Sequence, residues 1–373
     1  MKKSKKQIFI FNQYYYPAIK AGGPVKSLKL LCEVLKDKFE ISIFTSSFDI
    51  DKKKIFRKKN KNLNIINFDS YIDILKFLFQ NFFNKKRNSV FYFNSFFNVK
   101  YTILPLIFIK LFALKNKVIL APRGELFDTE IKKKFIKKII YIIFFKFFLK
   151  KNIIFHATSL DEKKIINKIF DKNKIKILPN LIEINKKIFY LKKIKEPFKF
   201  IFYSRISPKK NLLMTLNVLS KLNFQIIFHI YGPIENKIYW KSIKSKISYL
   251  NKNNNQLNIS YKGVVKSNPY KIINNYNFFI LLSDSENFGH VIFESIYSKC
   301  IPIITSNAPW TILSKLKCGL LLDNKNLNLN KIRKFIKRSK INSKEIQNKL
   351  EQIVKRTYSK QKKLKYEELF INS

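Results

Sequence analysis

Two glutamates that lie eight positions apart carry the clearest chemical signal in the sequence. Glu286 lies in a polar loop behind a short apolar run at 278–282, and Glu294 lies on the amphipathic helix that comes next. Phe288 and Gly289 stand between them, where the loop turns into the helix. In an open parallel sheet, ligands bind outside the carboxyl ends of the strands, beside helix N-termini. We therefore expect the two carboxylates to line one crevice, with ordinary solvated acids as the alternative.

A second candidate group is cationic and follows another apolar run. Arg205 and Lys210 lie in the segment YSRISPKKN, at 203–211, after a predicted strand at 198–203. Arginine offers a forked set of donors and lysine a point charge, and together they suit a pyrophosphate. The alternative is that they are two ordinary cations in a chain that has 75 lysines and arginines.

Glycines are scarce, so their positions are informative. The chain has seven, and Gly22 and Gly23 follow the first predicted strand and precede a helix, as a phosphate-binding turn would. No GxGxxG or GxxxxGK[ST] motif is present, which disfavours dinucleotide and P-loop chemistry. Asp49 and Asp51 have the spacing of a metal–nucleotide DxD motif, but three lysines follow them in a predicted surface loop.

The three histidines have no metal-ligand spacing. His156 and His229 lie at or near the ends of predicted strands and are interpreted as structural, and His290 flanks the crevice with its role left open. We therefore expect no metal site and no cofactor.

Strands and helices alternate through both halves of the chain, which predicts an α/β protein with two doubly wound parallel sheets. We expect a first domain at 1–182, a charged connection at 183–197 and a second domain at 198–354. Among the predicted helices, one is continuous over Glu130–Lys150, and another begins at a capping box, Ser159-Leu160-Asp161-Glu162.

The formal net charge of +51 is extreme. It indicates either an anionic partner, nucleic acid or an acidic membrane surface, or a base composition that favours lysine codons. The three cysteines form neither a disulfide pattern nor a zinc pattern and are typical of reduced thiols. The N-terminal apolar run is too short for a signal peptide, and no run is long enough to span a bilayer, so we expect a cytoplasmic or peripheral protein.

In combination, these motifs resemble glycosyltransferase family 4, the retaining nucleotide-sugar enzymes of the GT-B fold. The resemblance spans most of the chain, and its segments occur in the family's order. These segments are YYYPAIKAGGPVKSLKLL near the start, APRGEL at 121–126, HATSLDE at 156–162, LPN at 178–180, YSRISPKKNL at 203–212, IYG at 230–232, YKG at 261–263, and SDSENFGHVIFES at 283–295 with CIPIITS behind it. The resemblance implies two Rossmann-like domains that face a central cleft, with a C-terminal helix at 355–373 packing back onto the first domain.

The resemblance also implies a role for each motif residue. Arg205 and Lys210 would bind the donor pyrophosphate and stabilise the departing nucleoside diphosphate without a metal, and Glu286 would contact the transferred sugar. The other implied donor contacts are made by the backbone at Phe288 and Gly289, by Glu294 at the ribose, and by Gly22 and Gly23 at the diphosphate. Arg123 falls where many relatives carry a sugar-facing histidine, so this chain departs from the family there.

The implied acceptor is a growing glycan, carried on a lipid during assembly of a surface polysaccharide or lipopolysaccharide. The segment at 130–155 is cationic and apolar, which is typical of a helix that lies on the anionic cytoplasmic face of an inner membrane. A core helix with a solvated lysine face is the alternative. Two other functions compete, a GT-B nucleotide-sugar epimerase and a basic nucleic-acid-binding protein, but we expect no nucleic acid as partner.

Overall fold

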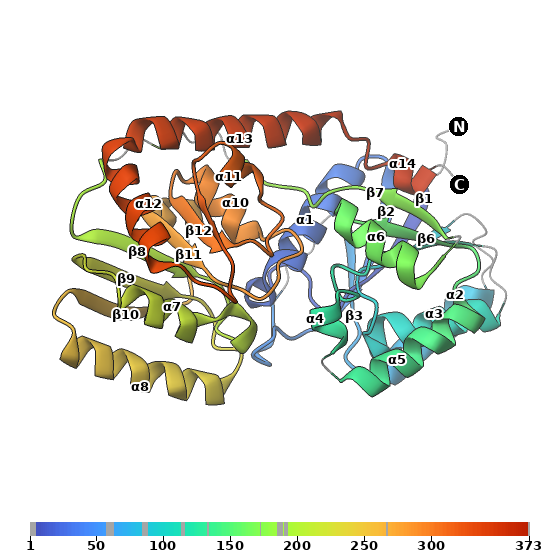
Figure 1. The fold of residues 1–373 in the computed structure, drawn as a ribbon. Helices are drawn as coiled ribbons and strands as arrows, with labels where there is room; N and C mark the ends of the chain where they lie inside the picture. Colours follow the sequence, from blue (N-terminus) through green and yellow to red (C-terminus); the bar gives the residue numbers. More distant parts are fainter. Residues whose placement is uncertain are drawn as a thin grey trace. The chain divides into compact units, whose positions relative to one another are not determined.

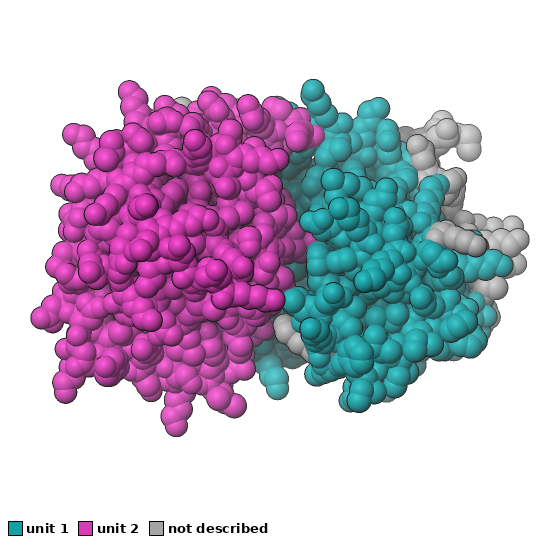
Figure 2. Space-filling model, viewed as in Figure 1, with its two compact units in different colours: residues 1–183, 361–373 teal, residues 184–360 magenta. Residues whose placement is uncertain are grey.

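The computed structural model describes residues 5–56, 63–83, 89–112, 116–132, 134–171, 173–184, 189, 193–265 and 268–371. The chain forms two compact units (Figure 2). Unit 1 comprises Met1–Glu183 and Gln361–Ser373, and unit 2 comprises Ile184–Lys360. Of the expected connection at 183–197, residues 185–188 and 190–192 lie outside the described residues.

Unit 1 contains a seven-stranded parallel sheet with the order β3-β2-β1-β4-β5-β6-β7 (Figure 1). The strand order reverses between β1 and β4, and this reversal defines the point where doubly wound sheets bind ligands. The strands are β1 Lys6–Phe11, β2 Phe39–Thr45, β3 Leu63–Asn67, β4 Ser89–Phe93, β5 Lys117–Leu120, β6 Ile153–Ala157 and β7 Lys174–Ile177.

Helices connect these strands. They are η1 Ile19–Ala21, α1 Gly23–Leu35, α2 Tyr71–Phe83, η2 Val99–Ile103, α3 Leu104–Leu111, α4 Asp128–Ile131, α5 Phe135–Phe144, η3 Phe145–Leu149, α6 Leu160–Ile169 and α14 Glu368–Ile371. The predicted capping box is confirmed, because Ser159 Oγ accepts a hydrogen bond from the Glu162 amide at 3.1 Å. The prediction of one helix over 130–150 is wrong. Lys134 has a φ of 58°, and a left-handed residue cannot continue a right-handed hydrogen-bond ladder, so α4 and α5 are separate.

The core of unit 1 is built largely of phenylalanine on one side of the sheet. Phe11 stacks on Phe44 and on Phe93, with ring centroids 4.7 and 5.1 Å apart. On the other side, the C-terminal segment adds Tyr366, Leu369 and Phe370 to a cluster with strand residues. Phe370 packs against Tyr92 of the central strand β4, so the end of the chain is part of this core.

Unit 2 contains a six-stranded parallel sheet with the order β10-β9-β8-β11-β12-β13, and its strand order reverses between β8 and β11. The strands are β8 Phe198–Tyr203, β9 Ile226–Tyr231, β10 Leu257–Gly263, β11 Phe278–Leu281, β12 Ile301–Thr305 and β13 Leu320–Leu322. The helices are η4 Pro208–Lys210, α7 Leu212–Leu219, α8 Lys237–Asn253, α9 Pro269–Ile273, α10 His290–Tyr297, α11 Ile312–Lys315, α12 Leu329–Ile341 and α13 Ser343–Lys363. The predicted pair of doubly wound parallel sheets is confirmed.

Candidate functional site

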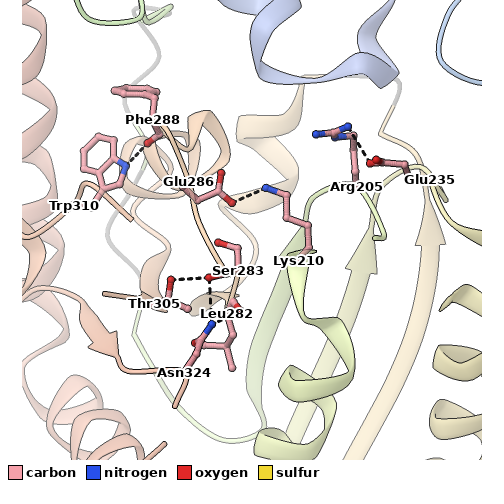
Figure 3. Close-up of polar contacts among 10 residues, drawn as sticks. All are labelled: Arg205, Lys210, Glu235, Leu282, Ser283, Glu286, Phe288, Thr305, Trp310 and Asn324. Carbon is pink, nitrogen blue, oxygen red and sulfur yellow. Dashed lines mark hydrogen bonds and ion pairs between the residues drawn. The ribbon is translucent and has the colours of Figure 1, made fainter. Parts of the chain in front are cut away.

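Two loops meet at the point where the strand order of unit 2 reverses. One follows β8 and contains η4, and the other follows β11 (Figure 3). The amide of Asp284 donates to the carbonyl of Lys209 at 3.0 Å, and the side-chain amide of Asn211 donates to the Asp284 carboxylate at 2.5 Å. These bonds fix the two loops to each other, at the place where open α/β sheets bind ligands.

Lys210 and Glu286 form an ion pair across this junction. Lys210 Nζ donates to Glu286 Oε1 at 2.5 Å, and the exposed fractions of the two side chains are only 9% and 10% (Figure 3). Because both side chains are largely removed from water, removal of either one would leave the other buried without a partner. The structure thus brings together one predicted cation and one predicted carboxylate.

Arg205 does not pair with either predicted glutamate. Its guanidinium lies 2.9 Å from the carboxylate of Glu235, which comes from the loop after β9 (Figure 3). Both side chains are about one third exposed, at 36% and 37%. Sequence reasoning missed Glu235, although an acid close behind a predicted strand is an informative signal in a chain with 24 acids.

The turn into α10 is fixed by glycine geometry and by an indole. Gly289 is the N-cap of α10 and has a φ of 73°, in the left-handed region that favours glycine. Trp310 Nε1 donates to the carbonyl of Phe288 at 2.6 Å, which holds the preceding residue in place. The expected loop-to-helix turn at Phe288 and Gly289 therefore exists as a rigid feature.

Glu294 lies on α10 and is 3% exposed. Burial and the nearby Glu294 carboxylate both raise the pKa of Tyr203, at the end of β8. The two predicted glutamates therefore differ in setting: Glu286 is ion-paired in the loop, and Glu294 is enclosed beside the end of β8.

Two buried polar atoms lie beneath this loop. The carbonyl of Ser283 accepts from Thr305 Oγ1 at 2.9 Å, and the Asn324 side-chain amide donates to the carbonyls of Leu282 and Ser283 (Figure 3). Ser283 Oγ and Asn324 Oδ1 are buried without a hydrogen-bond partner among the described residues. The sequence motif at 283–295 includes Ser283, but Asn324 was missed because it follows a strand too short to predict.

In unit 1, Gly22 and Gly23 mark the start of α1. Gly22 is its N-cap, with φ of 85° and ψ of −143°, and no side chain caps the helix. The nearby DxD-like pair is occupied by this chain: Asp51 forms an ion pair with Lys20 at 2.5 Å, which lowers the pKa of that carboxyl, and Asp49 accepts from the Lys20 amide at 3.3 Å.

Arg123 follows β5 in a left-handed conformation, with a φ of 56°. Its guanidinium donates to Asn94, Asn180 and the Tyr92 hydroxyl, which belong to the ends of neighbouring strands of unit 1. His156 bonds Tyr92 at 2.9 Å and the Leu178 carbonyl at 2.9 Å, in keeping with its structural interpretation.

The remaining histidines also have aromatic neighbours. His229 bonds the Tyr276 hydroxyl at 2.7 Å, and the ring of His290 lies 4.9 Å from that of Phe288. Across the described ranges, no three acidic, histidine or cysteine side chains are arranged to hold a metal ion.

Comparison with known proteins relates this chain to glycosyltransferases. Residues 183–360 match the family model described as glycosyl transferases group 1. The chain is 29% identical over 225 residues to an uncharacterized glycosyltransferase, MJ1059, of Methanocaldococcus jannaschii. That match covers 55% of this chain and 52% of the relative, so it spans about half the length of the curated protein.

Two solved structures share the fold over most of this chain. Anabaena Alr3699/HepE, solved with UDP and glucose, has a TM-score of 0.67 at 13% identity and covers 92% of each chain. WaaG, a glycosyltransferase involved in lipopolysaccharide biosynthesis, has a TM-score of 0.66 at 11% identity and covers 98% of this chain and 97% of its own. The predicted glycosyltransferase resemblance is confirmed at this level, and the narrower family 4 stays a prediction. The chain has the two-unit GT-B architecture, and its residues 183–360 match the model of the glycosyl transferases group 1 family.

Proposed function

We propose that this protein transfers a sugar from a nucleotide-sugar donor to a growing surface glycan, with retention of configuration and without a metal. The observation that carries the proposal is the Lys210–Glu286 pair, which lies at the strand reversal of a glycosyl transferases group 1 domain. UDP-glucose as donor and a lipopolysaccharide-type acceptor are suggested by the complex of Alr3699/HepE with UDP-glucose and by the involvement of WaaG in lipopolysaccharide biosynthesis.

The cations of unit 2 supply the electrostatics for loss of a nucleoside diphosphate. The Arg205–Glu235 pair is one third exposed, and such pairs contribute at most about 1 kcal/mol, so a diphosphate can replace Glu235 at little cost. Lys210 has three donor hydrogens, and its one ion pair among the described residues is with Glu286. Lys210 can therefore hold Glu286 against the sugar and still face the leaving phosphate.

The remaining roles in unit 2 are those that the family resemblance implies. Glu294 accepts hydrogen bonds from the ribose, and the backbone at Phe288 and Gly289 meets the donor. Unit 2 is thus the donor-binding part, and unit 1 addresses the acceptor.

Donor binding is tested by thermal unfolding with UDP, because a ligand that binds only the folded state raises the melting temperature. We expect stabilisation of the wild type in the presence of EDTA, and its loss in Arg205→Gln. Arg333→Gln, which removes an equal charge elsewhere in unit 2, is the matched control. Equal loss in both variants, or stabilisation only with added metal, contradicts the proposal.

The lipid-linked acceptor is supported by an exposed apolar stripe on unit 1. Ile136, Ile140, Ile143 and Phe147 recur at helical spacing along α5 and η3, and Ile136 and Phe147 are 72% and 79% exposed. Lysines accompany the stripe: Lys132, Lys134, Lys137, Lys138, Lys146, Lys150 and Lys151. An apolar stripe with adjacent cations suits a shallow position on an anionic membrane, at about 1 kcal/mol for each basic residue near the surface. In the described part of the chain, no helix is long and apolar enough to cross a bilayer.

Co-sedimentation with vesicles that contain phosphatidylglycerol tests this surface. We expect the wild type to bind, binding to weaken as salt rises, and the double variant Phe147→Ser/Phe148→Ser to bind at least about 10-fold less. Ile238→Ser, at an 83% exposed position on α8, should bind as the wild type does. Equal binding by the two serine variants contradicts this location of the membrane surface.

A further inference from the structure

The guanidinium of Arg123 is held in unit 1 by neutral groups. Nε donates to Asn94 Oδ1 at 2.6 Å, one terminal nitrogen donates to Asn180 Oδ1 at 2.6 Å, and the other donates to the Tyr92 hydroxyl at 2.7 Å. These acceptors lie at or just beyond the ends of β4 and β7. The orientation of the cation is therefore fixed from three directions before any ligand arrives.

No carboxylate lies within ion-pair distance of Arg123 among the described residues. Glu162 is near, but its oxygens accept from the Gly124 amide, the Thr158 amide and the Thr158 hydroxyl. The two cations predicted for the donor site are both paired with acids, although acids are scarce in this chain. Arg123 thus has no direct ion-pair partner among the described residues.

Tyr92 and His156, which continue the hydrogen-bond chain from Arg123, stay neutral near pH 7. Burial, and next the charge of Arg123, lower the pKa of His156 to about 3. Burial raises the pKa of Tyr92 to about 12, against the effect of Arg123. The hydrogen-bond chain from Arg123 through Tyr92 to His156 therefore orients the cation without cancelling its charge.

Unused donors gather at the same place. A guanidinium has five N–H bonds, and three are engaged, so two remain. Asn94 is 3% exposed, and its Nδ2 is buried without a hydrogen-bond partner among the described residues. The amide of Asn94 bonds the Phe11 carbonyl at 3.1 Å, which places Asn94 between β1 and β4, where the strand order of unit 1 reverses.

We propose that Arg123 and Asn94 form an oxyanion site that recognises a carboxylate or phosphate group carried on a sugar. A forked guanidinium binds either group through paired, charge-assisted hydrogen bonds, and a neutral hydroxyl uses the same site less well. The inference rests on the proposed function only in taking the anion to be part of a sugar substrate. It deepens that function by making the substrate acidic, either as donor sugar or as acceptor.

The first experiment uses free sugars at constant ionic strength. Binding of glucuronate, glucose 6-phosphate and glucose to the full chain is measured by calorimetry. We expect at least one of the two anions to bind about 10-fold or more tightly than glucose. That preference should be lost in Arg123→Gln and reduced in Arg123→Lys, which keeps the charge but not the fork. Arg333→Gln, the charge-matched control, should keep it.

Folding is checked in the same variants by their unfolding transitions, because Arg123 joins three strand ends. Asn94→Ala removes the unused Nδ2 and leaves two of the three acceptors of Arg123, so it should weaken anion binding in a chain that still folds. Anions that bind no better than glucose to the wild type, or an anion preference that survives in Arg123→Gln, would overturn the site.

A second arm distinguishes the source of the anion. If UDP-glucuronate binds more tightly than UDP-glucose in the wild type and equally in Arg123→Gln, the acidic sugar belongs to the donor. If only the free acidic sugars respond to Arg123, the acidic group belongs to the acceptor. Both results support the site. A wild type that binds glucuronate but does not bind UDP would instead contradict the transferase proposal and still support the oxyanion site.

Discussion

At the scale of single residues, we expect the Lys210–Glu286 pair to contribute both to the stability of unit 2 and to the proposed sugar transfer. Both side chains are about nine-tenths buried, so the loss of either one leaves the other buried without its partner. The exposed Arg205–Glu235 pair lacks this dependence. The two ion pairs of the site should therefore respond differently when one partner is removed.

Lys210→Ala should lower the free energy of unfolding by about 3–5 kcal/mol, because it leaves the Glu286 carboxylate buried without a cation. Replacing both residues, as Lys210→Met with Glu286→Leu, should recover most of that loss while sugar transfer stays absent. Denaturant unfolding measures the first effect and a transfer assay the second. Arg205→Ala should change stability by less than about 1 kcal/mol. If the double variant loses as much free energy of unfolding as the two single variants lose together, the coupling is contradicted.

His156 should make the stability of unit 1 depend on pH. Its pKa is about 3 when folded and near 6.5 when exposed, so between those values the unfolded chain binds one more proton. Stability therefore falls as the pH drops below about 6.5, by roughly 2–3 kcal/mol at pH 4.5 from this residue. The difference in the free energy of unfolding between pH 7 and pH 4.5 should be smaller for His156→Gln than for the wild type. Equal differences would mean that His156 is protonated in the fold.

Several of these residues could be predicted from sequence for a physical reason. Lys210 and Glu286 both follow apolar runs, and parallel strands bring their carboxyl ends to one edge, so their meeting follows from topology. The pairing of Arg205 with Glu235 could not be predicted, since it depends on which loop lies nearest. The acceptors of Arg123, such as Asn94 and Asn180, were missed because single asparagines behind strands carry no periodic signal.

At the scale of elements, strand-end loops are positioned by glycines with no room for a side chain. A Cβ on Gly232, which follows β9, would lie 1.8 Å from the carbonyl oxygen of Ser204, next to Arg205. At Gly263, which ends β10, no heavy atom lies within 4 Å of the position that a Cβ would take. Both have positive φ, so the two sites differ mainly in the space available.

Gly232→Ala should therefore displace the loop that carries Arg205, reduce UDP affinity and lower the melting temperature markedly. Gly263→Ala should cost only about 1–2 kcal/mol, for its left-handed backbone, and leave UDP affinity unchanged. Thermal unfolding with and without UDP compares the two variants. Similar losses of affinity would mean that the Ser204 carbonyl does not position the site.

Predictability at this scale depended on length and periodicity. The continuous apolar segment that forms β8 matched its predicted bounds of 198–203. The three-residue β13 was missed because so short a run has no period. The break at Lys134 was missed because lysine gives no warning of a left-handed backbone.

At the scale of the whole molecule, unit 1 is assembled from both ends of the chain. Lys38 pairs with Glu367 at 2.6 Å, and the Tyr366 hydroxyl bonds the Pro179 carbonyl at 2.7 Å. The C-terminal segment also contributes Leu369 and Phe370, both at most 1% exposed, to the core beside β1 and β4. The last residues therefore stabilise the first domain rather than the one that precedes them.

Phe370→Ala should lower the free energy of unfolding of unit 1 by about 3–5 kcal/mol through loss of burial and the cavity it leaves. Ile371→Ala, at the next and half-exposed position, should cost under about 1 kcal/mol. Hydrogen exchange of strands β1 and β4 would assign the effect to unit 1. A loss of protection confined to unit 2 would contradict this placement of the segment.

The discontinuous composition of unit 1 has a consequence for biosynthesis. The strands of unit 1 are made first, but the piece that completes its core is translated roughly 190 residues later. At about 5–20 residues per second, that delay is about 10–40 s, during which unit 2 can fold. Unit 1 is thus completed after unit 2, and its phenylalanine-rich core must avoid misassembly until Phe370 has been synthesised.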